Sequence, residues 1–116
     1  LVRWEPATGD ARRYTTRDGV PHDVVYCVYE DAHHRLWFST DYGIARFDKV
    51  TAQTRVFLPK DGLTHEEFNR TAHAQAADGR LFFGGLNGIT AFQPEAINPP
   101  RRNRPVLHLT RYQQLD

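Results

Sequence analysis

The sequence predicts an all-β protein made of β-propeller blades, each a four-stranded antiparallel meander, within a fragment of a larger propeller. Residues 30–48 recur in modified form as residues 77–93, so that Leu36 and Leu81, for example, stand 45 residues apart. Both copies consist of short apolar runs separated by turn residues. A repeat of this length built from short strands is typical of propeller blades, which bury their faces only against neighbouring blades.

The domain organisation follows from where the repeat starts and stops. Residues 1–17 are expected to end a preceding blade, residues 18–60 to form a complete blade, and residues 61–97 to form a last, incomplete blade. Residues 98–105 are rich in proline and arginine and are interpreted as a linker. Residues 106–116 open with an alternating apolar pattern and are expected to supply the first strand of a following domain.

The strands are expected where apolar and β-branched residues gather between turn signals. In the complete blade these runs are residues 24–30, 35–40, 44–47 and 54–58. In the last blade they are residues 71–76, 80–85 and 89–92. The connections are short, which predicts consecutive hairpins. Trp37 and Phe82 share one repeat position and are interpreted as wedges that pack between blades.

Composition excludes several classes of partner. Of the 116 residues, 40% are hydrophobic and 25% are charged, and the formal net charge is only +1, so no nucleic-acid partner is expected. No apolar run is long enough to cross a bilayer, so this segment is expected to make no membrane contact. The chain contains no Met, which is expected of a portion of a longer protein.

The complete repeat resembles a known family, the two-component regulator propeller repeat. The resemblance rests on Glu30-Asp31, a short turn, Leu36-Trp37-Phe38, and then Gly43-Ile44-x-Arg46-Phe47-Asp48. The second copy, with its Asp78-Gly79 turn, looks like the last repeat of such an array. In that family an immunoglobulin-like domain named for three tyrosines follows, and residues 105–110 are similar to its opening strand.

This resemblance implies a function. It implies the periplasmic sensor propeller of a membrane-anchored bacterial signalling protein, whose output domain is a histidine kinase or a diguanylate cyclase. It also implies a small-molecule or glycan ligand. One departure stands out, because His33-His34 occupy the turn where the repeat usually has Asp or Asn followed by Gly. The geometry of that hairpin is therefore left open.

Candidate ligand-binding residues follow from the order of hairpins in a propeller. The connections before each innermost strand, and between the second and third strands, are expected on one face, where propeller ligands commonly bind. Planar polar and aromatic groups that suit a sugar gather there, although Asn87 is also a common turn residue. The expected ligand-binding residues are His22, Tyr42, His65, Asn69, Arg70 and Asn87.

No catalytic set, cofactor or metal site is predicted. The adjacent histidines His33 and His34 diverge on a tight turn and match no zinc spacing. Glu30 and Asp31 point to opposite faces of a strand, so they are not expected to act as a pair. The absence of a catalytic set favours a binding module, or a purely structural dimerisation scaffold, over a propeller lyase or hydrolase fragment. The binding module is the preferred hypothesis, and the other two stay alternatives. Exposed blade edges also predict a homo-oligomer.

Overall fold

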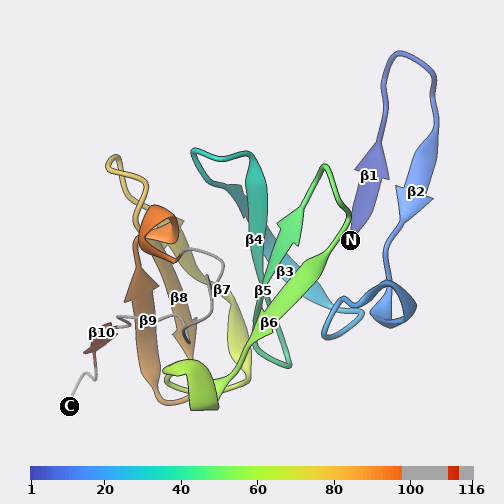
Figure 1. The fold of residues 1–116 in the computed structure, drawn as a ribbon. Helices are drawn as coiled ribbons and strands as arrows, with labels where there is room; N and C mark the ends of the chain where they lie inside the picture. The colour runs from blue at the N-terminus through green and yellow to red at the C-terminus, as the bar shows by residue number, and fades with distance from the viewer. Residues whose placement is uncertain (98–109, 113–116) are drawn as a thin grey trace, which may run out of the picture.

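The computed structural model describes residues 1–97 and 110–112 and contains ten β-strands and three short 3-10 helices (Figure 1). All strand pairs are antiparallel. The predicted all-β blade architecture is therefore confirmed. Within the described residues, no helix has the length and apolar character needed to cross a membrane. The predicted linker at residues 98–105 lies outside the described residues.

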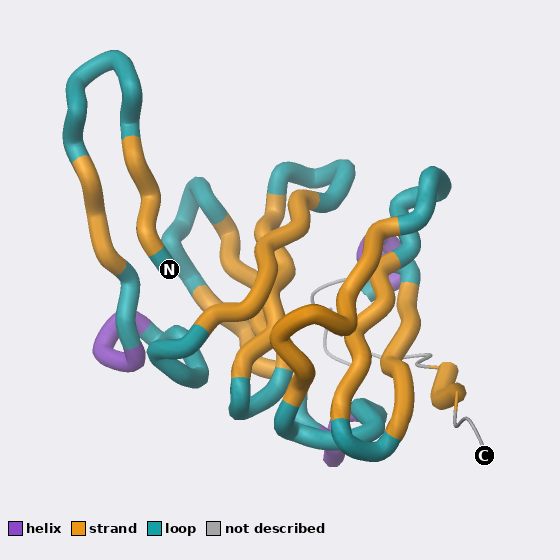
Figure 2. The backbone as a smooth tube through the Cα atoms, turned by 180° about the vertical axis from the view of Figure 1, so that it is seen from behind, coloured by secondary structure: helices purple, strands orange, loops and turns teal. Residues whose placement is uncertain are grey.

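The complete blade is a four-stranded meander in the order β3-β4-β5-β6. Its strands lie within one residue of the predicted bounds. They are β3 (Val25–Glu30), β4 (Arg35–Thr40), β5 (Ile44–Asp48) and β6 (Thr54–Phe57). Ahead of this blade, β1 (Val2–Trp4) and β2 (Ala11–Arg13) form a separate hairpin. The hairpin and the two larger sheets follow one another along the chain, as both views show (Figures 1 and 2).

The second larger sheet contains β7 (Phe68–Gln75), β8 (Leu81–Gly85) and β9 (Gly88–Phe92). Strand β10 (Thr110–Tyr112) pairs antiparallel with β9 and takes the fourth position in this sheet. The sequence assigned no strand of the last blade to that position. The assignment of residues 106–116 to a following immunoglobulin-like domain stays a prediction.

Strand β7 begins three residues earlier than the sequence predicts, and its pairing with β8 is irregular between Phe68 and His73. Two glycines on β8 explain why β7 lies so close to β8. A Cβ atom on Gly84 would lie 2.6 Å from the Ala72 Cβ, and one on Gly85 would lie 2.8 Å from the Glu67 carbonyl oxygen. The missing side chains therefore let β7 lie directly against β8.

Two hydrophobic clusters hold the sheets together. The larger one lies between the complete blade and the second sheet, where Trp37 stacks on Phe57 at 5.5 Å and contacts Phe92 at 4.9 Å between ring centroids. Trp37 is fully buried, as its interpretation as a wedge requires. Phe82 at the equivalent position is only half-buried. The smaller cluster packs Tyr14 and Phe47 on the opposite face of the blade.

Two connections of the same structure lead into the two larger sheets, one ahead of β3 and one ahead of β7. In the 3-10 helix Thr16–Asp18, the Asp18 carboxylate accepts a hydrogen bond from the Thr15 amide at 2.9 Å. Asp61 repeats this with the Leu58 amide, also at 2.9 Å, in the 3-10 helix Pro59–Asp61. A left-handed glycine follows each helix, and the next apolar residue, Val20 or Leu63, is buried. A third 3-10 helix, Pro94–Ala96, follows β9.

The β3–β4 turn, which the sequence left open, forms without glycine. His34 takes the left-handed conformation, with φ of 60°, that Gly79 takes at the equivalent turn with φ of 88°. The two turns close with matching hydrogen bonds, His34 N–H to Asp31 O at 3.0 Å and Gly79 N–H to Ala76 O at 2.9 Å. His34 therefore carries the backbone strain that glycine would avoid.

We expect His34→Val to lower the free energy of unfolding by about 1–2 kcal/mol, because a β-branched side chain is strongly disfavoured at positive φ. His34→Gly should leave stability unchanged or raise it. Chemical denaturation followed by circular dichroism measures both. His33→Val is the matched control, since His33 is exposed and lacks a positive φ. Equal losses from the two valine variants would contradict the backbone explanation.

Candidate functional site

The turns of the protein gather at two ends of the strands (Figure 1). The β1–β2, β3–β4, β5–β6 and β7–β8 turns lie at one end, and the β4–β5 and β8–β9 turns lie at the other with the helix Pro59–Asp61. We call the second group the loop end. The candidate residues Tyr42 and Asn87 lie in the β4–β5 and β8–β9 turns, at the loop end.

A polar cluster at the loop end centres on Tyr26 and Asp41. The Tyr26 hydroxyl on β3 donates a hydrogen bond to the Asp41 carboxylate in the β4–β5 turn. This hydrogen bond and the negative charge of Asp41 raise the pKa of Tyr26, and the nearby charge of Glu67 acts in the same direction. The positive charge of Arg70 acts in the opposite direction. The phenol therefore stays protonated and donates at neutral pH.

The two blades meet directly beside this cluster. The Gly43 amide, next to Tyr42, donates a hydrogen bond to the Glu66 carbonyl oxygen ahead of β7. Tyr42 itself is 47% exposed, and its amide is held by the Thr40 hydroxyl at 2.9 Å. The structure thus brings Tyr42 and Arg70 to the neighbourhood of the Tyr26–Asp41 pair.

His22 and His65 occupy equivalent places in the two connections. The Nδ1 atom of His22 accepts a hydrogen bond from the Val24 amide, and that of His65 accepts one from the Glu67 amide, each at 3.0 Å. Each ring therefore closes its own loop. In the neutral ring this leaves Nε2 as the donor. Both histidines have a structural task, and their predicted contact with a ligand stays a prediction.

Asn69 and Asn87 also serve local structure. The Asn69 side-chain oxygen accepts hydrogen bonds from the Thr71 amide at 3.2 Å and the Thr71 hydroxyl at 3.3 Å. Asn87 forms the two-residue β8–β9 turn with Leu86 and precedes Gly88, the first residue of β9, whose φ is 116°. Over residues 1–97, neither asparagine shares a hydrogen bond with the Tyr26–Asp41 pair.

Sequence reasoning missed Tyr26, Asp41 and Glu67. The sequence predicts only that Tyr26 lies on the first strand of the complete blade and that Asp41 lies in the loop after its second strand. The usable signal was their position, because Tyr26 stands near the start of β3 and Asp41 directly after β4. In an antiparallel pair these two places lie side by side.

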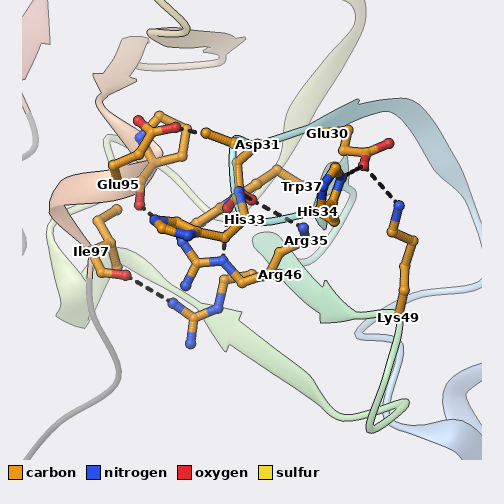
Figure 3. Close-up of polar contacts among 12 residues, drawn as sticks. Glu30, Asp31, His33, His34, Arg35, Trp37, Arg46, Lys49, Glu95 and Ile97 are labelled. Carbon is orange, nitrogen blue, oxygen red and sulfur yellow. Dashed lines mark hydrogen bonds and ion pairs between the residues drawn. The ribbon is translucent and has the colours of Figure 1, made fainter.

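At the opposite end, Asp31 is the most highly connected carboxylate of the blade (Figure 3). Its side chain is fully buried. It accepts hydrogen bonds from Trp37 Nε1 and Arg35 Nε, both at 2.8 Å, and from the backbone amides of His33 at 2.9 Å and Arg35 at 3.0 Å. Burial acts to raise the pKa of Asp31, but the hydrogen bonds from Trp37 and Arg35 outweigh it and lower the pKa.

These contacts explain why Glu30 and Asp31 do not act as a pair. Glu30 is directed to the other face, where its carboxylate contacts His34 Nδ1 at 2.6 Å and Lys49 Nζ at 2.8 Å. The expectation from strand geometry is therefore confirmed. His34 is held by Glu30 rather than aligned with His33 (Figure 3). Among the described residues, no group of three or more metal-binding side chains is found.

The comparisons with known proteins identify the repeat. Residues 19–42 match the family model described as "Two component regulator propeller". This span runs from the left-handed Gly19 through β3 and β4 to the β4–β5 turn, and so contains both Asp31 and the Tyr26–Asp41 pair.

The chain is also 30% identical over 90 residues to histidine kinase P4 of Formosa agariphila. The aligned region is 78% of this chain and 7% of that protein, so the chain spans a small part of its curated relative. The meander β3–β6 is therefore a propeller blade whose first half matches the two-component regulator propeller repeat, in a chain related to a histidine kinase.

Proposed function

We propose that this chain is part of the ligand-sensing propeller of a two-component-type signalling protein, and that its loop end binds a small polar molecule or a glycan. The observation that carries this proposal is the Tyr26–Asp41 pair beside Tyr42, Glu67 and Arg70. These groups come from two adjacent blades. They combine aromatic surface with both acceptors and donors, which is the combination that sugar hydroxyls and ring faces require.

The chemistry of the cluster favours binding over catalysis. A lyase or hydrolase would need a group that exchanges protons near neutral pH. The raised pKa of Tyr26 keeps its proton in place, and Asp41 is engaged as the acceptor of that proton. The pair therefore acts as a fixed hydrogen-bonding element. This supports a binding module rather than the enzyme alternative.

The remaining features of the proposed parent protein rest on the resemblance to the two-component regulator propeller family. A histidine kinase relative supports a signalling role. We further propose a periplasmic location, a following immunoglobulin-like domain, and a histidine kinase or diguanylate cyclase as the output domain. The predicted homo-oligomer stays a proposal, supported by the exposed Val2 and Trp4 on β1, which are 62% and 64% exposed.

The experiment compares variants of the complete protein by isothermal titration calorimetry against a panel of neutral and acidic oligosaccharides. Asp41→Asn and Tyr42→Ala should each weaken binding about tenfold, the loss expected when a hydrogen bond or an aromatic contact with the ligand is removed. Neither change lies in a hydrophobic cluster, so thermal melting should be little affected.

Asp78→Asn is the matched control, because Asp78 is an exposed turn carboxylate at the other end of the strands. It should leave affinity unchanged. Equal affinities for wild type, Asp41→Asn and Tyr42→Ala toward an oligosaccharide that binds would place the site elsewhere and refute the loop-end assignment.

A further inference from the structure

A pocket of about 350 Å³ lies by the β5–β6 turn, at the end of the blade opposite Tyr26 and Asp41. Its cationic walls are Arg35 on β4, Arg46 on β5 and Arg55 on β6. Arg46 and Arg55 are direct cross-strand partners. Like charges in that arrangement destabilise a sheet. Such a local conflict is expected where binding, rather than folding, has shaped the sequence.

The aromatic core holds the two guanidinium groups in place. The guanidinium carbon of Arg55 lies 4.8 Å from the centre of the Phe57 ring. That of Arg46 lies 5.7 Å from the centre of the Trp37 ring, and Arg46 Nη1 donates a hydrogen bond to the Ile97 carbonyl oxygen at 3.0 Å (Figure 3). Burial, followed by the charges of Arg35 and Arg55, lowers the pKa of Arg46. The guanidinium groups of Arg46 and Arg55 thus repel each other, but contacts with the aromatic core and with Ile97 fix their positions.

The acidic groups nearby are bonded to groups other than Arg46 and Arg55. Asp31 holds Arg35 through the 2.8 Å contact to Nε. Asp48, the carboxylate on the pocket wall, accepts hydrogen bonds from the Val50 and Thr51 amides at 2.8 and 3.1 Å. Over residues 1–97, no ion pair joins a carboxylate to Arg46 or Arg55. The pocket therefore carries an excess of positive charge.

The preceding hairpin contains the same pocket with different charge. Arg3 and Arg12 are also direct cross-strand partners, and the guanidinium carbon of Arg12 lies 4.7 Å from the centre of the Tyr14 ring. This second pocket measures about 340 Å³. Its wall contains Asp10 where the first pocket has Gln53, which adds a carboxylate. The second pocket thus has a similar volume but no counterpart of Arg35, and two carboxylates in its wall, Glu5 and Asp10, balance its two arginines.

We infer that the Arg46–Arg55 pocket binds the oxyanion group, a carboxylate or a sulfate, of an anionic ligand, and that the Arg3–Arg12 pocket does so much more weakly. Planar guanidinium groups donate paired hydrogen bonds that match carboxylate and sulfate oxygens. Thr51 and Gln53 add neutral polar groups to the wall. Binding of an anion would also relieve the repulsion between the two arginines.

The test measures equilibrium dialysis of radiolabelled inorganic sulfate, and separately of radiolabelled citrate, against the complete protein with ionic strength held constant by chloride. We expect saturable binding of at least one probe. Arg55→Gln and Gln53→Asp should each weaken the site about tenfold, as expected for losing or opposing a charge-assisted hydrogen bond. Gln53→Asp should not disturb the fold, because Asp10 already occupies the equivalent turn position. This variant therefore tests the site even if Arg55→Gln is unstable.

The controls separate this site from general anion effects. Arg12→Gln, in the charge-balanced pocket, should change affinity less than twofold. The same should hold for Arg80→Gln, because Arg80 is exposed and lies ahead of β8, outside both pockets. Asp41→Asn should leave sulfate binding intact, so this inference and the loop-end site can fail separately. Wild-type affinity in both Arg55→Gln and Gln53→Asp, or an equal loss in Arg80→Gln, would overturn the assignment.

Discussion

Asp31→Ala should lower the free energy of unfolding by about 3–5 kcal/mol, the cost of removing one partner from a buried charge pair. The substitution leaves the Trp37 indole N–H, the Arg35 guanidinium and two backbone amides without their acceptor. Arg35 also reaches the Pro94 carbonyl oxygen at 3.4 Å, so the contact with the following blade should loosen as well. Urea denaturation followed by circular dichroism measures the loss.

A double-mutant cycle with Trp37→Phe tests the cause. The second copy of the repeat has Ala76 and Phe82 at the positions of Asp31 and Trp37, so acceptor and donor are absent together. Asp31→Ala in a Trp37→Phe background should therefore cost less than in wild type, with a coupling energy of about 1 kcal/mol or more. Additive losses would show that Asp31 and Trp37 act independently.

The lowered pKa of Asp31 gives a second readout of the same contacts. A carboxylate whose pKa is lower in the folded state stabilises the fold above its unfolded pKa of about 3.9. That contribution is lost as the pH falls from about 4 through the folded pKa. Wild type should therefore lose more stability over this acidic range than Asp31→Asn, which cannot titrate at this position.

Gly43→Ala should lower the free energy of unfolding by about 3 kcal/mol or more, through strain at positive φ together with steric overlap. Gly43 has φ of 88°, and an added Cβ atom would overlap the Phe57 carbonyl oxygen and approach Leu58 Cδ2 to 2.9 Å. The loop that presents Asp41 and Tyr42 cannot shift freely, because the Gly43 amide is bonded to the Glu66 carbonyl oxygen. The melting temperature and the affinity for oligosaccharide should both fall.

Gly9→Ala separates the two causes. Gly9 also has a positive φ, of 74°, but an added Cβ atom there meets nothing within 4 Å. Its loss should be about 1 kcal/mol, the backbone contribution alone. If Gly9→Ala and Gly43→Ala cost the same, the overlap with the β6 backbone would not be the reason for the larger effect.

The link between the two blades is made by polar contacts as well as by the aromatic core. The Ala32 amide donates a hydrogen bond to the Glu95 carboxylate at 3.3 Å, and Arg46 bonds to the Ile97 carbonyl oxygen (Figure 3). Both contacts tie the complete blade to the segment after β9. Arg46 has Ala91 at the equivalent position in the second copy, so this copy cannot repeat the arginine contact toward its own next neighbour.

The candidate site was predictable only in outline. Tyr42 and Arg70 could be placed at the loop end, because hairpin order assigns turns to ends of a sheet. His22, His65 and Asn69 were also expected at this end. The side chains of His22 and His65 are hydrogen-bonded within their own loops, and Asn69 lies on β7, where its side chain is hydrogen-bonded to Thr71. Tyr26 and Asp41 were missed, since their hydrogen bond depends on which residues of two strands lie opposite each other.

The sequence by itself determined the blade architecture and nearly all strand bounds, because repetition and apolar patterning are local properties that any copy of the repeat displays. It also showed where glycine would be needed, and so marked His34 as an exception. Only the tertiary structure revealed that His34 takes the left-handed conformation and that Asp31 collects four hydrogen bonds. Only the tertiary structure also showed that Arg46 and Arg55 are cross-strand partners and lie over the rings of Trp37 and Phe57. These features depend on strand register and on contacts between blades, which bring together side chains that are distant in the sequence.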